Sequence, residues 1–426
     1  MIPLAEAQAR VRGACEPLRP LALPLGETLG CVTSVPVRSE VAVPPFANTA
    51  VDGYAVRAAD TAGAADRGAT PGGVRLRVVA TLPAGGDPAG LHVGPGEAIR
   101  IMTGAPVPAG ADAIVMVEVT SEEDGGDTVV ITEAAHEGAH VRPAGEDIAP
   151  GQEVFPAFTV LTPGHLGVLA SIGLRRAPVF PKARVGVLST GDELVDGGDE
   201  LRPGQIRDSN RATLLGLVAE AGCVPVDLGL VRDDEDEVRA ALTRGVGECD
   251  ALLTSGGVSM GDFDYVKKVL DELSGAGAGG DAVTWMQVAI RPAKPLSFGV
   301  VDGVPVFGLP GNPVSSMVSF ELFARPALRQ MMGHRHPDRP VVRALADEPL
   351  RRRPDGKTHF FRVSASFAPD GRLHVRSSGG QASNLLRSMA LANALAVLPD
   401  GDGVEAGGEV DVMVLAEAGS FPGGRQ

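Results

Sequence analysis

The sequence has few cysteines and no cysteine pair at the spacing of a metal site. The 426-residue chain contains only Cys15, Cys31, Cys223 and Cys249, which are widely separated. Because no CxxC pair occurs, a structural zinc site is not expected, and Cys223 and Cys249 are expected to be core thiols. No apolar run reaches the roughly 20 residues that cross a bilayer, so no membrane contact is expected. Residues 1–6 lack the features of a secretory leader, which predicts a reduced, cytoplasmic protein.

The chain also lacks an excess of positive charge. It carries 38 Lys and Arg against 53 Asp and Glu, a formal net charge of -15. Nucleic acid is therefore not expected as a ligand, because a phosphate backbone requires a basic face. A small phosphorylated ligand needs only a few local donors and stays possible. The GxxxxGK[ST] motif is absent as well, which excludes a P-loop interpretation.

The length and the spacing of apolar residues predict a multidomain α/β plus β protein. A chain of 426 residues is too long for one core. Short β-branched runs predict an inserted β domain over 43–141, and the flanking 1–42 and 142–178 are assigned to a discontinuous N-terminal linker domain. Strands alternating with helices predict a central three-layer α/β domain with a parallel-rich sheet over 179–332. Short strands return over 333–426 and predict a small β-barrel-like domain. The helix near 163–172 is expected to pack on the first helix of the chain.

The most informative segment runs over residues 254–265, with the sequence TSGGVSMGDFDY. It joins an apolar strand to a helix whose apolar stripe is Val266, Val269 and Leu270. A strand, a glycine turn and a helix N-terminus form an anion site, because free N–H groups and the helix dipole favour negative charge. Acids at its mouth, including Asp264, are consistent with a divalent cation next to a phosphate. An ordinary joint in which the acid caps the helix is the alternative.

Other polar loops follow the neighbouring strands and are expected to meet at one sheet edge. They bring Glu193 and Asp233 toward Asp264. Clustered carboxylates repel each other unless a cation binds, so we interpret these three acids as ligands of Mg²⁺ on a phosphorylated compound. The loop that enters the last helix of the domain holds Asn312, expected to cap that helix, and Pro313 in its first turn.

The remaining candidate site residues are two cationic side chains and several residues in turns. Arg291 and Lys294 stand between prolines and could hold an oxyanion, although solvated surface charges are the alternative. In the β section, Asp52, Thr103 and Arg142 lie in charged or polar turns. By spacing alone these turns are ambiguous.

Together the motifs resemble the molybdopterin molybdenumtransferase family, known as MoeA in bacteria and as the E domain of gephyrin-like proteins. The resemblance covers almost the whole chain in the right order. It rests on DGYA at 52–55, RIMTGA at 100–105, GED at 145–147, STGDEL at 189–194, SGGVS at 255–259, Gly261 with Asp264–Tyr265, and LPGNPVS at 309–315.

The resemblance implies the last step of molybdenum cofactor assembly. Adenylylated molybdopterin and molybdate would react with Mg²⁺ present, the metal entering the dithiolene and AMP leaving. It also implies a homodimer whose active site is shared between subunits. Transient contacts with molybdopterin adenylyltransferase and with molybdoenzyme chaperones are further implied partners.

The family's site residues are carried over by position. The implied catalytic acids are Asp264, Glu193, Asp233, Asp52 and Asp147, of which the first three are the implied metal ligands. Residues implied to bind the pterin or adenylate are Thr103, Arg142, Thr190, Gly191, Ser255, Gly256, Gly257, Ser259, Pro310, Asn312 and Pro313. The implied molybdate pocket consists of Arg291, Lys294, Pro295, Arg362 and Ser383.

The chain departs from the family pattern at four places, one of which is Arg291, where some members have Lys. Ala293 replaces a usual glycine, His140 stands where Asn is common, and 357–360 replaces a more acidic, arginine-led run. Alternatives from the sequence are a molybdopterin adenylyltransferase-like enzyme, a scaffold, and a paralogue that binds the cofactor without catalysis. The sequence does not distinguish molybdate from the nearly isosteric tungstate.

Overall fold

The computed structural model describes residues 1–65, 73–198, 200–256, 265–273 and 283–415. The chain divides into two compact units. The α/β–barrel unit comprises residues 1–23, 30–34 and 178–426. The insertion unit comprises residues 24–29 and 35–177. In the described ranges, no helix is both long enough and apolar enough to cross a membrane.

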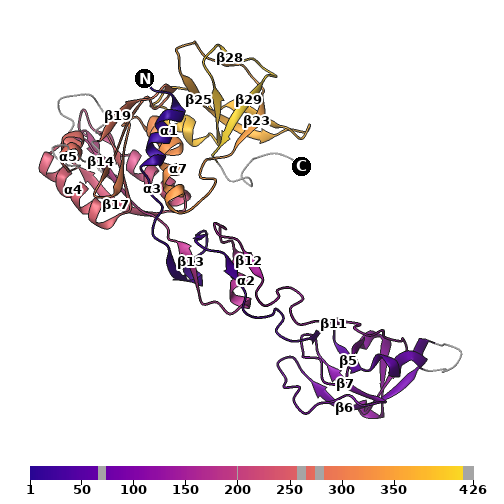
Figure 1. Ribbon diagram of the computed structural model, residues 1–426. Helices are drawn as coiled ribbons and strands as arrows, with labels where there is room; N and C mark the ends of the chain where they lie inside the picture. Colours follow the sequence, from indigo (N-terminus) through magenta and orange to yellow (C-terminus); the bar gives the residue numbers. More distant parts are fainter. Residues whose placement is uncertain (66–72, 199, 257–264, 274–282, 416–426) are drawn as a thin grey trace. The chain divides into compact units, whose positions relative to one another are not determined.

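The α/β domain is built on a six-stranded sheet in which four neighbouring strands are parallel (Figure 1). In sheet order the strands are β17 (Val224–Val231), β14 (Arg184–Thr190), β18 (Ala251–Ser255), β22 (Val304–Leu309), β21 (Pro295–Val301) and β19 (Thr284–Gln287). Strands β21 and β19 run antiparallel to their neighbours. The predicted parallel-rich sheet is confirmed, and β21 is a strand that the sequence analysis missed.

Helices cover both faces of this sheet. They are α1 (Leu4–Gly13), α3 (Asn210–Glu220), α4 (Glu235–Glu248), α5 (Tyr265–Leu273), α6 (Pro313–Ser319) and α7 (Arg325–Met331), the last two joined by a π-helical turn (Phe320–Ala324). Val187 of β14 packs in one core with α1, α3, α6 and α7, whereas the next residue, Leu188, packs in a second core with α4 and α5. Because side chains alternate along a strand, the result is the predicted three layers. The predicted apolar stripe of α5 lies in the second core.

The first helix belongs to the α/β core. Its buried residues Ala7 and Val11 pack in the same cluster as α7. The apolar side of α1 is therefore covered by the α/β domain, and the expectation that it pairs with the helix near 163–172 is wrong. All four cysteines are buried, as predicted for Cys223 and Cys249.

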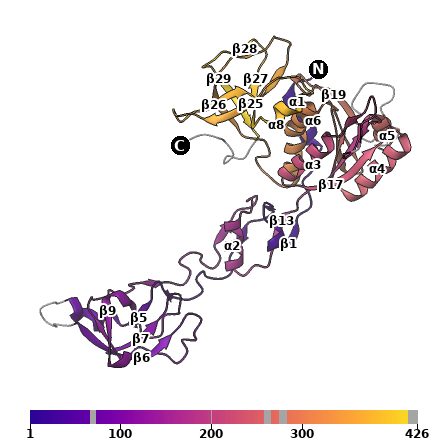
Figure 2. The ribbon, with the colours of Figure 1, turned by 180° about the vertical axis from the view of Figure 1, so that it is seen from behind.

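The C-terminal residues form a closed five-stranded barrel, which confirms the predicted barrel-like domain (Figure 2). Its strands, in order around the barrel, are β25 (Thr358–Phe367), β26 (Leu373–Ser377), β23 (Val341–Ala346), β29 (Glu409–Val414) and β27 (Ala394–Leu398), which pairs with β25 again. A small ladder of β24 (Leu350–Arg351) with β28 (Gly403–Val404) and the helix α8 (Leu386–Ala390) are attached to it. The short strand β20 (Ile290–Arg291), from the α/β section, pairs with β25 and sets Arg291 beside His359. Arg291 is thus held by the barrel.

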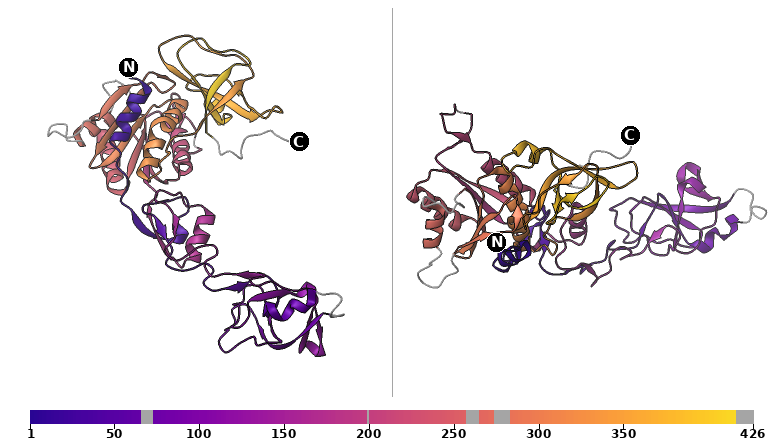
Figure 3. Two further views of the ribbon diagram at one scale, coloured as in Figure 1. Left: turned by 45° about the vertical axis from the view of Figure 1, so that its right-hand side comes forward. Right: turned by 90° about the horizontal axis from the view of Figure 1, so that it is seen from above.

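The insertion unit contains the predicted β domain, drawn in purple in Figure 3. Its six-stranded sheet has the order β8 (Ala113–Met116), β5 (Gly53–Val56), β7 (Glu97–Ile101), β6 (Val74–Leu82), β10 (Thr128–Ile131) and β9 (Thr120–Glu123). Apolar side chains are buried on both faces, with Tyr54 in one cluster and Ala55 in the other. Shorter pairs are β4 (Asn48–Thr49) with β11 (Val141–Arg142) and β3 (Val37–Arg38) with β12 (Glu153–Phe155), followed by α2 (Pro163–Ser171).

The short strands of the chain that remain form two further small sheets. They are β1 (Leu21–Pro24), β13 (Arg176–Phe180) and β2 (Val32–Thr33) in one sheet, and β15 (Leu194–Val195) with β16 (Ile206–Arg207) in the other.

Candidate active site

The carboxyl ends of the four parallel strands lie along one edge of the sheet. The register sets Thr190 beside Val231 and Ser255 beside Leu309. The loops that follow these strands therefore begin at the same edge, as predicted. The candidate residues that the structure brings to this edge are Thr190, Gly191, Ser255, Gly256 and Pro310. Three other candidates, Gly257, Ser259 and Asp264, lie outside the described residues.

Gly256 brings two of these strand ends into close contact. Its N–H donates to the Leu309 carbonyl at 3.2 Å, and its φ of +96° lies in the left-handed region. A Cβ atom added here would lie 2.9 Å from the Thr190 carbonyl oxygen, closer than side chains tolerate. Glycine is therefore required at this position for both conformation and space.

Asn210, the first residue of α3, connects two further loops. Its Nδ2 donates to Ser255 Oγ and to the Gly311 carbonyl, each at 2.7 Å. These two bonds fix the separation of neighbouring strand ends. Sequence analysis missed this role, because an amide at the start of a helix is typical of a cap. The first turn of the helix is instead bound by Asp208, two residues before it, whose Oδ1 accepts the Arg211 N–H at 3.1 Å.

Carboxylates gather at the ends of β14 and β17. The Asp233 N–H donates to Asp192 Oδ1 at 3.3 Å, which joins the two loops. Burial raises the pKa of Asp233, and the negative charges of Asp192 and Glu193 raise it further. Gly191 leaves room for Glu193, since an added Cβ would lie 2.7 Å from Glu193 Oε2. The structure thus brings Glu193 and Asp233 together and adds Asp192, which the sequence analysis did not select.

These acids do not form a complete metal site by themselves. Within the described ranges, no three His, Cys, Asp or Glu side chains are grouped so that they could hold a metal ion. The crowding of Asp192 and Glu193 around Asp233 nevertheless fits a hard cation, which prefers carboxylate oxygens. The Mg²⁺ site stays a prediction.

A cavity of about 400 Å³ opens beside this edge, and we call it the sheet-edge cavity. Because β21 is antiparallel to β22, its first residue, Pro295, lies near the carboxyl end of β22. The Lys294 carbonyl accepts from the Val288 N–H at 2.8 Å, and the Ser383 carbonyl from the Val314 N–H at 3.1 Å. The lining consists of Ile290, Arg291, Pro292, Ala293, Lys294, Pro295, Pro310, Asn312, Ser315, Lys357, Gln381, Ala382 and Ser383. Candidates from three distant parts of the sequence thus share one cavity.

The entry to α6 differs from the expectation in one respect. Pro313 occupies the first helical turn, as predicted, and the Asn312 carbonyl accepts the Ser316 N–H at 2.9 Å. The side chain of Asn312 makes no cap hydrogen bond with the start of the helix. Asn312 lines the sheet-edge cavity instead, so its expected capping role is wrong.

Ala293 adopts the backbone conformation of the glycine that it replaces. It is buried and has a φ of +75°. An L-residue in this region is strained because its Cβ crowds a carbonyl oxygen. The loop therefore keeps the geometry that a glycine would allow. His140 likewise has a positive φ of +55°, where Asn is better tolerated.

A second cavity, of about 410 Å³, adjoins the first, and we call it the arginine cavity. Both cavities are lined by Arg291, Pro292, Gln381 and Ala382. Arg362 lines only the arginine cavity, so the predicted molybdate residues are divided: Lys294, Pro295 and Ser383 line the other cavity. Arg362 is 1% exposed and its Nη2 donates to the carbonyls of Gly380 and Ala382 at 2.9 and 3.0 Å. Burial lowers its pKa to about 10.

The candidates in the insertion unit form a separate group. Asp52 Oδ1 accepts the N–H and the hydroxyl of Thr103, each at 2.7 Å, and these bonds lower the pKa of Asp52. Arg142 pairs with Asn48 across β11 and β4. The Asp147 N–H donates to a carbonyl of the 43–44 turn at 3.0 Å. The structure therefore joins Asp52 to Thr103 and leaves both Arg142 and Asp147 exposed.

Family models match three consecutive parts of the chain. The model described as "MoeA N-terminal region (domain I and II)" matches residues 2–173. The "Probable molybdopterin binding domain" matches residues 186–330, and the "MoeA C-terminal region (domain IV)" matches residues 344–415. The matches cover both compact units.

Full-length relatives give the same result. The chain is 42% identical to molybdopterin molybdenumtransferase 2 of Mycobacterium tuberculosis, over 92% of this chain and 93% of that protein. It is 35% identical to molybdopterin molybdenumtransferase of Haemophilus influenzae, over 91% of each. A solved molybdopterin biosynthesis MoeA protein from Pyrococcus horikoshii is 30% identical, with a TM-score of 0.78, over 98% of this chain and 100% of that chain. The chain therefore belongs to the molybdopterin molybdenumtransferase (MoeA) family.

Proposed function

We propose that this protein inserts molybdate into adenylylated molybdopterin and releases AMP in a Mg²⁺-dependent reaction. One observation carries the proposal beyond family membership. The sheet-edge cavity joins cationic and hydroxyl side chains, suited to an oxyanion, to the ends of the parallel strands, suited to a phosphorylated ligand. The two reacting groups would thereby be held side by side.

Molybdate would occupy the sheet-edge cavity as a substrate. The ammonium group of Lys294, the guanidinium group of Arg291 and the Ser383 hydroxyl offer donors to its oxygens. Charge-assisted hydrogen bonds of this kind are about twice as strong as neutral ones. Pro295 and the bound backbone of Lys294 would keep these donors in place.

The pterin phosphate and adenylate would lie along the strand ends. Thr190, Ser255 and Gly256 supply hydroxyl and backbone groups there, with Asn312 and Pro310 on the side of the cavity. Glu193, Asp233 and Asp264 would hold Mg²⁺, together with Asp192. When bound, the ion would neutralise charge on the phosphoanhydride. The carboxylates would also orient the attacking group.

The insertion unit would complete the site in a homodimer. Asp52, Thr103, Arg142 and Asp147 carry family motifs but belong to the other compact unit. We therefore propose that they act on the α/β domain of the partner subunit. The four-domain division, the cytoplasmic location and transient contacts with molybdopterin adenylyltransferase and molybdoenzyme chaperones belong to the same proposal.

Release of AMP tests the proposed function directly. The purified protein is incubated with adenylylated molybdopterin and Mg²⁺, with and without molybdate. We expect AMP release that depends on molybdate and yields active cofactor. Binding without AMP release would instead indicate a paralogue that carries the cofactor, and synthesis of adenylylated molybdopterin from ATP would indicate an adenylyltransferase. Replacing molybdate by tungstate in the same assay determines the metal preference.

A further inference from the structure

The loop between β14 and α3 carries Asp192 and Glu193 but has little apolar contact with the rest of the domain. Between residues 192 and 207, no side chain that the structure describes is buried, and Ile206 is 55% exposed. None of these described side chains belongs to the two apolar cores of the α/β domain. Because apolar burial is what usually fixes a segment, polar contacts have to set the position of this loop.

A short parallel ladder gives the loop its shape. Strands β15 and β16 pair with each other within it. The Ile206 N–H donates to the Glu193 carbonyl at 2.8 Å, and the Asp208 N–H donates to the Val195 carbonyl at 3.0 Å. The backbone of Glu193 is therefore bound to the ladder, so the contacts that hold the ladder also place this acid.

Arg211, in the first turn of α3, joins the carboxyl ends of both ladder strands. Its guanidinium group contacts three carboxylates, which belong to Asp196 directly after β15, to Asp208 directly after β16 and to Asp227 of β17. The distances to Asp208 and Asp227 are 3.2 and 2.6 Å. Asp208 Oδ1 also accepts from Ser189 Oγ at 3.2 Å, at the end of β14. Arg211 thus connects the ladder to the sheet and to α3.

The chemistry of arginine suits this junction. The Arg211 side chain is 12% exposed, and the Asp208 side chain that it contacts is 0% exposed. Burial opposes the charge of Arg211, but its bonds to Asp227, Asp208 and Asp196 outweigh burial and raise its pKa above the usual range. A planar guanidinium group has five N–H donors, so it can bind carboxylates from three segments at once.

We propose that Arg211 is a positioning residue of the reaction, because its bond to Asp196 fixes the loop of Glu193 at the sheet edge. The Asp196 side chain is 65% exposed, and an exposed pair contributes little to stability. Its contribution is geometric: it keeps the loop where Asp192 Oδ1 accepts the Asp233 N–H. A displacement of about 1 Å can slow a reaction about 100-fold. This role rests on the proposed function, in which these acids hold Mg²⁺.

Asp196→Asn tests the proposal, because it weakens the bond of Arg211 to the loop and leaves its other two partners. Hydrogen exchange of the full-length protein, measured by mass spectrometry without substrate, reports on the loop directly. Peptides that contain Ile206 and Asp208 should exchange about 10-fold faster than in the wild type, because the ladder opens more often. The Mg²⁺ concentration for half-maximal AMP release should rise about 10-fold, as expected when the support of a metal ligand is lost. The molybdate concentration for half-maximal release should stay unaltered.

Asp227→Asn is the matched control. It makes the same change of charge at a partly exposed partner of the same guanidinium group, but on a strand that its ladder with β14 holds in place. Loop exchange and the Mg²⁺ requirement should therefore stay close to the wild-type values. Asp196→Glu restores a carboxylate and should return both values toward the wild type. Wild-type loop exchange in Asp196→Asn, or equal effects of Asp196→Asn and Asp227→Asn, would overturn the proposal. Thermal unfolding checks that each variant is folded.

Failure of this proposal is distinguishable from failure of the proposed function. Faster loop exchange in Asp196→Asn, together with a wild type that releases no AMP, would contradict the function and leave the contact between Arg211 and the loop supported. Molybdate-dependent AMP release by the wild type, with unaltered exchange and Mg²⁺ requirement in Asp196→Asn, would contradict only the role of Arg211.

Discussion

The two adjoining cavities differ in where their charged groups come from and in how those groups are held. The sheet-edge cavity is lined largely by loops at the ends of strands, and its residues Lys294 and Ser383 lie in such loops. The arginine cavity is lined by barrel strands and by the loop at 351–355, supported by the buried Arg352. Loops at strand ends supply chemistry because the sheet beneath them is rigid. The barrel builds its cavity from buried ionic contacts, so its charges contribute to stability as well as to binding. Substitutions in the barrel should therefore lower stability, whereas substitutions at the strand ends should change AMP release.

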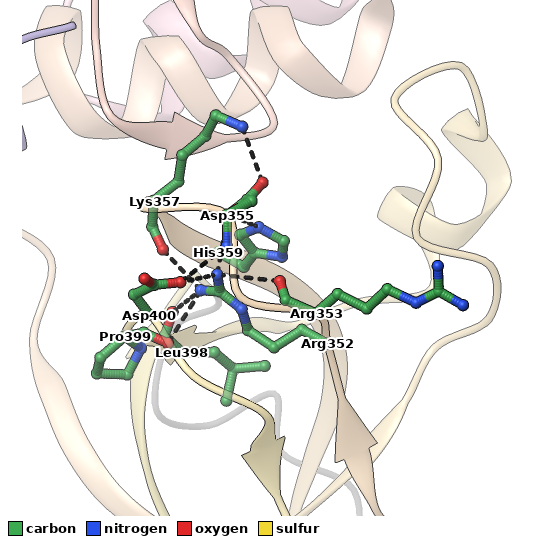
Figure 4. A network of polar contacts seen from close by, with 8 residues as sticks. All are labelled: Arg352, Arg353, Asp355, Lys357, His359, Leu398, Pro399 and Asp400. Carbon is green, nitrogen blue, oxygen red and sulfur yellow. Dashed lines mark hydrogen bonds and ion pairs between the residues drawn. The ribbon is translucent and has the colours of Figure 1, made fainter.

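The largest expected effect is on stability and concerns the arginine cavity. Arg352→Met should lower the free energy of unfolding by about 3–5 kcal/mol, because the four backbone carbonyls that accept from its buried guanidinium group would lose their donor (Figure 4). Chemical denaturation followed by circular dichroism measures this loss. Arg343→Met removes an exposed arginine of the same domain and should cost no more than about 1 kcal/mol. Equal losses would show that Arg352 is not the support of the cavity wall.

The next effect is on the chemistry at the sheet edge. Glu193→Gln should slow AMP release by about 10²–10³-fold, because a carboxylate beside Asp233 would no longer act on the phosphoanhydride. The folded structure should persist, since Glu193 lies in a loop outside the core. Glu248→Gln, at the exposed end of α4, makes the same change of charge and should leave the rate of AMP release unaltered. A full rate in Glu193→Gln would remove this acid from the reaction.

A smaller effect concerns the affinity for molybdate and not the maximal rate of AMP release. Lys294→Met should raise the molybdate concentration for half-maximal AMP release by about 10- to 100-fold, since one charge-assisted bond is lost. A molybdate titration of AMP release measures the change. Lys268→Met removes an exposed lysine that pairs with Glu235 and serves as the control. An unchanged titration in Lys294→Met would place molybdate elsewhere.

Ala293→Gly should stabilise the protein by up to about 1 kcal/mol. Glycine relieves the strain of a φ of +75°, although it also adds freedom to the unfolded chain. Ala293→Val should destabilise it, because a β-branched side chain is still less compatible with this conformation. Thermal unfolding of the two variants should give shifts of opposite sign. A lower melting temperature for Ala293→Gly would contradict the assignment of strain.

The smallest effect concerns His359 in the wall of the arginine cavity. Burial and the charge of Arg352 lower its pKa, with Arg291 adding to the effect and Asp355 opposing it. Since the folded pKa lies below that of the unfolded chain, this histidine stabilises the fold above about pH 6.5, and its contribution is lost as the pH falls below that value. NMR titration of the ring should give a value below the usual range. The variant His359→Gln removes the signal for assignment.

A comparison of the predicted and observed strands also shows which parts of the structure can be predicted from the sequence. Alternating strands and helices predicted the parallel strands, because crossover connections force parallel pairing. The antiparallel strand β21 was missed, although Asp302 and Gly303 both have positive φ in a tight turn between Val301 and Val304. Asp-Gly at that spacing is a strong hairpin signal.

The site was predictable to the extent that its residues sit in loops at strand ends. Glu193 and Lys294 lie in such loops, and Ser255 is the last residue of β18. Asn210 and Arg352 were not predictable in this way, because an amide at the start of a helix and an arginine just after a short strand are ordinary on a protein surface. Their roles depend on partners far away in sequence, such as Gly311 for Asn210 and Asp400 for Arg352. Spacing along the chain carries no information about such pairs.

The strand β20 has a consequence for how the protein unfolds. It pairs with the barrel through β25, and the barrel residues Phe360 and Leu395 are buried in the same apolar core as Val187 of the α/β sheet. The boundary between the family models at residues 330 and 344 is therefore not a boundary in folding. A chain truncated there would expose that core and lose one wall of both cavities. The α/β domain and the barrel should melt together, as one cooperative transition in a calorimeter.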